Sequence, residues 1–298
     1  MKLLVVGMGS IGRRHARLAR ELGWNVSVVS QHPTEYPHHA TIGEALQENP
    51  PDAIIIAKPT AEHFQVIREI EAQAAGISIL VEKPLFDRAL DFVSTKNRYF
   101  VAYNLRFHPV YQRIQELLQN SAVLYAQVTV GSYLPSWRPE RDYRSSYSAH
   151  RAQGGGVVLD LSHEIDCLMN WFGDDWNVVS LSENTKSLEI DSDDLCMALL
   201  RRDGGPRVFL HMDYLSRLPF RRGIIQCGDK TIFYDFVRPS VQVSGQPEET
   251  FSVERDDTYR AQLQALAHQD PSLCSLEQGH AIMRLADELQ KQSHSFST

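Results

Sequence analysis

The feature that most constrains the fold is an alternation of short apolar runs with helix-like segments over the first hundred residues. Continuous Val/Ile/Leu runs joined by helices are typical of a parallel sheet that is covered on both faces. The sequence therefore predicts an α/β fold with an N-terminal, doubly wound parallel sheet. The expected strands are 2–6, 25–29, 52–57, 78–81 and 99–102, and the expected helices are 11–22 and 61–75.

The pattern changes after about Arg106. Short β-like segments with turn signals between them fill residues 177–253, which predicts a C-terminal α+β domain with an open, mostly antiparallel sheet. We expect a boundary in a short connection, with a dinucleotide-binding Rossmann domain over 1–105 and a substrate-binding and oligomerisation domain over 106–298. Further helices are expected over 108–119, 258–268 and 276–290, and a further strand over 123–133.

Composition excludes several classes of protein. The 298 residues are 43% hydrophobic and 22% charged with a formal charge of −7, which argues against disorder and against nucleic acid as a partner. No apolar run is long enough to span a membrane, and the N-terminus becomes polar too early for a signal peptide. The four cysteines are too far apart for a metal or redox motif. We expect a cytoplasmic protein with reduced thiols and no metal.

A glycine motif stands between the first expected strand and helix. Residues 7–12 read GMGSIG, which matches GxGxxG. In such a loop Gly7 makes the tight turn, Gly9 lets the backbone approach a pyrophosphate, and Gly12 allows close packing of helix and strand. The helix N-terminus offers unpaired N–H groups to the phosphates. This setting predicts dinucleotide binding, and the alternative is a glycine-rich turn without a cofactor.

The end of the second strand indicates which dinucleotide is bound. An NAD site usually has Asp or Glu there to bind the ribose hydroxyls, but this chain has Ser30-Gln31-His32 and no carboxylate before Glu35. Arg13, Arg14 or His32 could pair with a 2′-phosphate. NADP is therefore favoured over NAD, unless the two arginines only decorate the exposed face of the helix.

Glu82-Lys83-Pro84 follows the fourth expected strand at its carboxyl end, the edge that faces the ligand crevice in open α/β sheets. Lys83 there can hydrogen-bond a substrate hydroxyl, or have its pKa lowered beside the positive nicotinamide ring. The alternative is an ordinary surface lysine before a proline turn.

The segment 154–173, GGGVVLDLSHEIDCLMNWFG, can form one amphipathic helix. Asp160 and His163 then lie together on the face opposite the apolar stripe. A neutral histidine can take a proton from an alcohol, and a neighbouring carboxylate can fix its tautomer. The alternative is a solvated polar face. A zinc motif is dismissed because Cys167 stands where the second histidine would be.

The segment 133–150 is rich in aromatic and arginine side chains. Aromatic faces suit stacking on a sugar or base, and guanidinium groups grip phosphate or carboxylate. With Arg106, they make an anionic sugar or sugar nucleotide a candidate substrate. The alternative is a loop that covers the sheet or meets a neighbouring subunit. The side chains concerned are Trp137, Arg138, Arg141, Tyr143, Arg144 and Tyr147.

These features, in this order, resemble the Gfo/Idh/MocA family, which contains glucose–fructose oxidoreductase and inositol dehydrogenase. The resemblance covers nearly the whole chain, and the 10–15 and 142–149 segments look like members associated with surface-polysaccharide sugars. The matching pieces are GMGSIGRRH (7–15), IAKPTAEH (56–63), VEKPL (81–85), NLRFHP (104–109) and DLSHEID (160–166).

The resemblance implies that Lys83 and His163 are catalytic. Asp160 is the expected third member, although it lies three residues before the histidine and the family's aspartate commonly lies four before. Lys58 departs from the usual Thr or Asn. A cis Lys83–Pro84 bond and an oligomer formed through the open sheet, a homodimer or homotetramer, are also implied.

The family positions that match extend both expected sites. The cofactor residues expected are Gly7, Gly9, Ser10, Ile11, Gly12, Arg13, Ser30, Gln31, His32, Lys58, Pro59, His63, Glu82 and Lys83. The substrate residues expected are Asn104, Arg106, Trp137, Arg138, Tyr143, Arg144, Tyr147 and His163.

The function predicted is hydride transfer between NADP or NAD and a hydroxyl or keto carbon of a sugar, sugar nucleotide or cyclitol. His163 would be the general acid/base, Lys83 would polarise the oxygen, and Asp160 would support the histidine. One alternative is a binding protein that senses NAD(P) without chemistry. The other is a reductase of a non-sugar substrate such as an imine.

Overall fold

Strand β1 (Lys2–Val6) lies inside a seven-stranded sheet of order β15-β6-β5-β4-β1-β2-β3. It pairs in parallel with β2 (Asn25–Val29) and β4 (Ala53–Ile56). Among the described strands of this sheet, only the short β15 (Cys274–Ser275) joins its neighbour antiparallel. All four residues of β4 are buried, as expected of a strand covered on both faces. The predicted parallel sheet is confirmed. The structure, a computed structural model, describes residues 1–31, 34–182 and 184–295.

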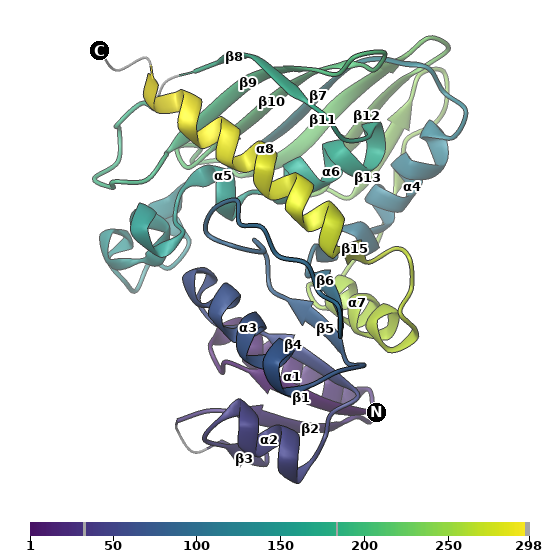
Figure 1. Cartoon of the computed structure of the whole chain (residues 1–298). Helices are drawn as coiled ribbons and strands as arrows, with labels where there is room; N and C mark the ends of the chain where they lie inside the picture. The colour runs from purple at the N-terminus through teal and green to yellow at the C-terminus, as the bar shows by residue number, and fades with distance from the viewer. Residues whose placement is uncertain (32–33, 183, 296–298) are drawn as a thin grey trace. The chain divides into compact units, whose positions relative to one another are not determined.

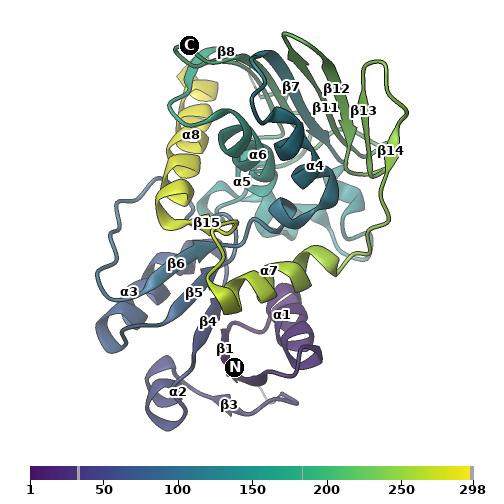
Figure 2. The ribbon, with the colours of Figure 1, turned by 90° about the vertical axis from the view of Figure 1, so that its right-hand side faces the viewer.

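One face of this sheet is covered by helices from the two ends of the chain. Helices α1 (Ser10–Glu21) and α7 (Asp257–His268) pack on each other, and their Leu18, Leu263 and Leu266 share one buried cluster with Leu3 and Val5 of β1 (Figure 2). Helices α2 (Ile42–Glu48) and α3 (His63–Gln73) form a second packed pair. The remaining elements of this part are β3 (His38–His39), η1 (Thr60–Glu62), β5 (Ser78–Val81), β6 (Arg98–Val101) and η2 (Asn104–Phe107).

The chain divides into two compact units, and each unit is made of two separate stretches of the sequence. The first unit contains residues 1–107 and 255–280, and the second contains 108–254 and 281–298. The division expected from the sequence assigned 255–280 to the second domain. In the structure this segment supplies α7 and β15 to the first unit, because α7 covers α1 and β15 extends the sheet at β6.

The second unit is built on an eight-stranded sheet of order β14-β13-β12-β11-β7-β10-β9-β8. Its strand pairs are antiparallel except for β10 against β7, so the predicted open, mostly antiparallel sheet is confirmed. The strands are β7 (Val123–Gly131), β8 (Asn177–Leu181), β9 (Leu195–Arg201), β10 (Arg207–Asp213), β11 (Phe220–Cys227), β12 (Thr231–Asp235), β13 (Ser240–Val243) and β14 (Glu249–Thr250).

Helices cover one face of this sheet (Figures 1 and 2). Helices α4 (Pro109–Leu118), α5 (Val157–Asp160) and α6 (His163–Phe172) contact β13, β9 and β7 respectively. In the part of the chain that the structure describes, no helix covers the opposite face, where Tyr125, Met197, Leu199 and Phe233 are exposed. Helix α8 (Leu276–Ser295) closes the described chain, and no described helix is long and apolar enough to cross a membrane. Four one-turn helices precede α5: η3 (Leu134–Ser136), η4 (Tyr143–Ser145), η5 (Tyr147–Ala149) and η6 (Arg151–Gln153).

The structure does not have the one continuous helix that the pattern over 154–173 allowed, so that expectation is wrong. The structure has α5 and α6 with a break at Leu161 and Ser162, so Asp160 ends one helix and His163 begins the next. The polar side chains here are not a solvated face either. Asp160 is buried, and Glu164 is buried and paired with Arg221 of β11 at 2.8 Å between Oε1 and Nε. Partners from distant strands therefore replace the solvent that a simple amphipathic pattern assumes.

Candidate active site

The three motif glycines have the geometry that the motif requires. Gly7 has φ +103°, and a side chain there would meet the carbonyl oxygen of Ala57 at 2.6 Å. A side chain on Gly12 would collide with the carbonyl of Gly7, so this position brings the helix and the loop into contact. Around Gly9 nothing lies within 4 Å of an added Cβ, which leaves the loop open to a ligand.

The N-terminus of α1 is prepared for an anion. Gly9 is its N-cap, no side chain caps the first turn, and no acidic residue stands there. The first N–H groups and the positive end of the helix dipole therefore face outward from the open side of the loop. Ser10 and Ile11, also expected at the cofactor, are the first two residues of this helix. These features fit the pyrophosphate of a dinucleotide.

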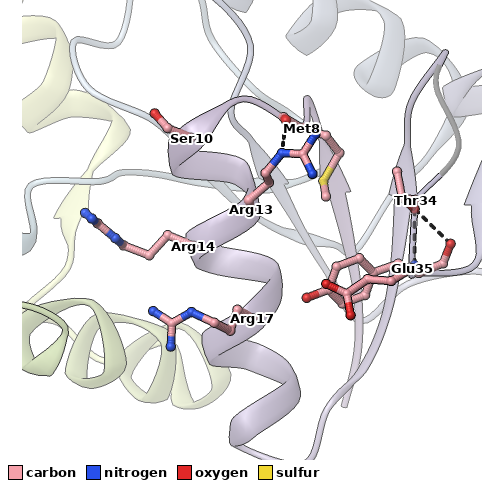
Figure 3. A pocket seen from close by; sticks show the side chains of 8 residues that line it. Met8, Ser10, Arg13, Arg14, Arg17, Thr34 and Glu35 are labelled. Carbon is pink, nitrogen blue, oxygen red and sulfur yellow. Dashed lines mark hydrogen bonds between the residues drawn. The ribbon is translucent and has the colours of Figure 1, made fainter. Parts of the chain in front are cut away.

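A cavity of about 330 Å³ adjoins the loop, between α1 and the segment after β2 (Figure 3). Arg13 lies on the side of this cavity where Thr34 and Glu35 stand, and its Nε donates to the carbonyl of Met8 at 3.1 Å. Figure 3 shows Arg14 and Arg17 pointing the other way. Arg13 therefore presents the remainder of its guanidinium to the cavity.

The other two arginines at this cavity, Arg14 and Arg17, bind the segment 255–280, which returns to the first unit and is called the returning segment below. The Arg14 guanidinium lies 4.9 Å from the ring centre of Tyr259, and its Nε is 3.4 Å from Asp256. Arg17 donates to Asp256 at 2.5 Å. Glu35, the first acidic residue after β2, pairs with Arg20 at 2.8 Å. Of the residues expected here, Ser30 and Gln31 directly follow β2, and His32 lies outside the described residues.

The EKP turn is connected to the glycine-loop helix. Oε1 of Glu82 lies 2.6 Å from Nε2 of the fully buried His15 in α1, and Oε2 accepts the backbone N–H of Lys83 at 3.3 Å. The expected cis Lys83–Pro84 bond is confirmed. Because β1 and β5 run parallel on either side of β4, the glycine loop and Lys83 leave the same edge of the sheet.

His63 connects this turn with the one after β4. It is buried, with Nε2 2.9 Å from the carbonyl of Lys58 and Nδ1 3.2 Å from the carbonyls of Pro84 and Leu85. Burial lowers the pKa of His63, so the ring is neutral and donates through one nitrogen. The Lys58 ammonium pairs with Glu62 at 2.8 Å in a partly exposed position, and Pro59 begins the turn into η1.

Asp160 is held by two tyrosines in the second unit. Tyr147 donates to Oδ1 at 2.9 Å and Tyr214, which follows β10, donates to Oδ2 at 2.6 Å. The charge of Asp160 and burial raise the pKa of Tyr147, and burial, then Asp160, raises that of Tyr214. Both phenols therefore stay protonated and donate. His163 begins α6 three residues later, so its position follows that of this fixed carboxylate.

Gly156, the last residue of the glycine run 154–156, directly precedes α5. A side chain on Gly156, which has φ +120°, would collide with the carboxylate of Asp193. That fully buried carboxylate accepts the N–H of Val158 in the first turn of α5 at 2.9 Å and a side-chain bond from Gln290 at 3.1 Å. Burial raises the pKa of Asp193. The start of α5 is thus fixed by a contact that only glycine permits.

Two of the residues expected at the substrate bind the returning segment within the first unit. Buried Arg106 donates to Oε1 of Gln278 at 2.9 Å, and Asn104 donates to Oγ1 of Thr258 at 2.8 Å. In the second unit, Arg144 pairs with Asp142 at 2.8 Å and Glu189 at 2.6 Å. The hydroxyl of Tyr143 accepts the N–H of Glu189 at 3.3 Å.

Within each unit the structure brings one set of expected residues together. The first unit groups the glycine loop, the Lys58 turn and the EKP turn, and the second places Tyr147 on Asp160. Sequence reasoning missed His15 and Tyr214, which hold Glu82 and Asp160. His15 is one helical turn after Gly12, which was a usable signal, whereas Tyr214 is 54 residues from its partner and gave none.

A Rossmann unit with an open glycine loop, followed by a mostly antiparallel sheet, defines the two-domain architecture of a dinucleotide-dependent oxidoreductase. Comparison with known families agrees. Residues 1–98 match the oxidoreductase family with an NAD-binding Rossmann fold, and residues 111–233 match the GFO/IDH/MocA C-terminal domain. The chain belongs to the Gfo/Idh/MocA family, a family of NAD(P)-dependent dehydrogenases acting on sugar CH–OH groups.

Solved structures share this fold along nearly the whole chain. UDP-N-acetylglucosamine 3-dehydrogenase GnnA from Acidithiobacillus ferrooxidans is 19% identical with a TM-score of 0.76, covering 98% of this chain and 97% of that one. The WlbA dehydrogenase from Bordetella pertussis is 16% identical with a TM-score of 0.79 (99% and 96% covered). Levoglucosan dehydrogenase is 16% identical with a TM-score of 0.82 (98% and 96% covered). No curated protein matches the sequence.

Proposed function

We propose that the protein transfers a hydride between NAD(P) and a hydroxyl or keto carbon of a sugar or sugar nucleotide. The observation that carries the proposal is the common sheet edge of the glycine loop and Lys83, which sets a candidate catalytic lysine beside a dinucleotide loop. The relatives support the substrate class. The WlbA structure is a complex with NADH and UDP-GlcNAcA, and the levoglucosan dehydrogenase structure is a complex with NADH and levoglucosan.

The roles of the residues follow from their chemistry. NAD(P)⁺, held by the Gly7–Gly12 loop and the N-terminus of α1, would supply the acceptor for the hydride of the substrate carbon. His163 removes the proton of the hydroxyl as general base and returns it in the reverse direction. The Lys83 ammonium donates a hydrogen bond to the same oxygen and stabilises the charge that develops there. Asp160 supports His163 through the position of the α5–α6 break, where Tyr147 and Tyr214 fix the carboxylate.

We also propose NADP rather than NAD as the preferred cofactor. Arg13 faces the cavity beside the loop, while Arg14 and Arg17 are bound to Asp256. A 2′-phosphate at this point would pair with the Arg13 guanidinium. Glu35, which could bind ribose hydroxyls, is instead engaged by Arg20. The expected readout is a rise of at least tenfold in the NADPH Kd of Arg13→Ala, with the NADH Kd changed less than threefold.

The function is tested by nicotinamide absorbance with purified protein, in both directions and with both cofactors. Substrates are neutral sugars, inositols, uronic acids and nucleotide-activated sugars. Turnover by the wild type, reduced at least 100-fold in Lys83→Ala and in His163→Ala with unchanged NADPH affinity, supports the mechanism. Arg88→Ala, at an exposed position, is the control. Binding of NADPH without turnover on any substrate favours a cofactor-sensing protein.

The uncovered sheet face supports a homo-oligomer as the assembled form. Its exposed apolar side chains lie on three of the eight strands, β7, β9 and β12, so they form an extended surface rather than isolated positions. A second copy of this chain presenting the same face would bury all of them.

A further inference from the structure

We propose that the cavity formed by residues 134–148 is an anion subsite that takes a phosphate or carboxylate carried by the sugar substrate. Its volume is about 200 Å³, small for a whole nucleotide and suited to one anionic group with its attachment. All of its lining comes from this one segment of the second unit, including Trp137, Arg138, Arg141 and Tyr147. The inference rests on the proposed function for the sugar part of the ligand only.

The charge balance of this cavity is positive. Asp142 is its one acidic lining residue, and Arg144 neutralises it with Nε 2.9 Å from both carboxylate oxygens. Among residues 1–31, 34–182 and 184–295, the guanidinium groups of Arg138 and Arg141 find no hydrogen-bond or ion-pair partner. Two exposed cations thus remain without counter-charge at a concave site, and a bidentate guanidinium is the side chain best matched to phosphate or carboxylate.

Four neutral donors of the lining, on Trp137, Ser145, Ser146 and Tyr147, are already used. Ser145 Oγ donates to the carbonyl of Asp142 at 2.7 Å, and Ser146 Oγ donates to that of Tyr143 at 2.6 Å. The phenol of Tyr147 donates to Asp160. These side-chain donors hold the loop in its shape, and the two arginines are left to bind a ligand. Such a site favours an anion over the hydroxyls of a neutral sugar.

Two contacts orient the subsite. Trp137 is 39% exposed, its Nε1 donates to Ser132 at 3.0 Å, and its ring meets Tyr214 edge to face with centroids 5.3 Å apart. This leaves a fixed apolar surface beside the cations for the body of the ligand. Tyr147 lines the cavity and bonds to Asp160, so the subsite adjoins the candidate catalytic carboxylate. An anion held here would orient the rest of the substrate.

Calorimetric titration of the full-length protein saturated with NADP⁺ tests the inference. The probes are uridine diphosphate, glucuronate and, as the neutral comparison, glucose. We expect at least one anion to bind, and its Kd to rise at least tenfold in Arg138→Gln/Arg141→Gln. Arg201→Gln, an exposed arginine of β9, should bind like the wild type. The probe that responds distinguishes a phosphate from a carboxylate ligand.

Two results would overturn the subsite: wild-type protein that binds neither anion, or a double variant whose Kd stays within twofold. An unchanged melting temperature and NADPH affinity show that the variant is folded, and Arg138→Lys/Arg141→Lys, which keeps the charges, should recover part of the binding. Turnover is measured separately. Anion binding without turnover on any sugar contradicts the proposed function alone, whereas turnover on neutral sugars without anion binding contradicts the subsite alone.

Discussion

The phenol of Tyr214 donates a 2.6 Å hydrogen bond to Oδ2 of Asp160, joining the end of β10 to the end of α5. The other oxygen of the same carboxylate accepts from Tyr147 at 2.9 Å. A buried carboxylate with one phenol on each oxygen cannot rotate without losing a bond. The pair therefore fixes the point where the chain leaves α5 and enters the helix that begins with His163.

Removing this phenol should destabilise the second unit. Tyr214→Phe removes a buried hydrogen bond to Oδ2 of Asp160, which costs about 1–3 kcal/mol. Tyr147→Phe should cost less, because its bond to Asp160 is longer, at 2.9 Å, and only partly buried, whereas that of Tyr214 is fully buried. Urea unfolding followed by circular dichroism measures both variants. Equal losses in the two would contradict a dominant role for Tyr214.

Two matched substitutions in the glycine loop should separate an effect on folding stability from an effect on cofactor binding. Gly7→Ala places a side chain against the carbonyl of Ala57 at positive φ, so we expect a loss of about 2 kcal/mol or more in unfolding free energy. Gly9→Ala meets nothing in the protein and should leave the melting temperature within about 2 °C. The NADPH Kd of Gly9→Ala should nevertheless rise at least tenfold, because the methyl group occupies the approach of the pyrophosphate.

Stability should fall in mild acid because of His108. Burial, with the nearby charge of Arg221, lowers the pKa of His108 to about 4, against an ordinary value of 6.5. The unfolded chain therefore takes up a proton below pH 6.5 that the folded chain refuses until about pH 4. The contribution to stability is complete above pH 6.5 and lost as the pH falls through this window, with about 2 kcal/mol lost by pH 5.

His108→Asn checks this pH dependence. Nδ1 of His108 caps α4 by accepting the N–H of Val110 at 3.2 Å, and asparagine can cap the helix without titrating. Urea unfolding at pH 7 and pH 5 should show a smaller difference for the variant than for the wild type. Parallel losses in both proteins would assign the acid sensitivity to other groups, such as buried His63, whose pKa is also lowered.

If the protein forms an oligomer through the uncovered sheet face, charges introduced on that face should dissociate it. Leu199→Glu/Phe233→Glu places two carboxylates on exposed positions of β9 and β12, so an oligomer formed through this face should dissociate. Light scattering after size-exclusion chromatography measures the mass. The matched control is Leu218→Glu, which is 84% exposed in the turn between β10 and β11. An unchanged mass in the double variant would place the interface elsewhere.

The sequence predicted those parts of the fold whose information is local. The strand–loop–helix around residues 7–12 and the buried runs of the parallel sheet depend on neighbours a few residues away, and the structure has them as predicted. The break between α5 and α6 could not be predicted in this way. It depends on buried polar groups whose partners, Tyr214 and Arg221, are more than fifty residues away.

In the candidate site too, the sequence predicted what is local but not what depends on partners far away in the chain. The sequence identified the arginines of the 133–150 segment as a group, but it could not tell a paired guanidinium from an available one. The structure separates Arg144, held by Asp142 and Glu189, from Arg138 and Arg141, which line a cavity. Similarly, Arg13 and Arg14 are adjacent in sequence, yet only Arg14 lies over Tyr259 of the returning helix.

The return of residues 255–280 to the first unit has a consequence for synthesis on the ribosome. The chain emerges from its N-terminus, so β1 to β6 are complete long before α7 and β15 exist. Until then, Leu18 and its neighbours on α1 lack the cover that Leu263 and Leu266 provide. The nascent dinucleotide-binding half therefore exposes an apolar face through the translation of the entire second sheet, an interval in which chaperone occupancy would matter most.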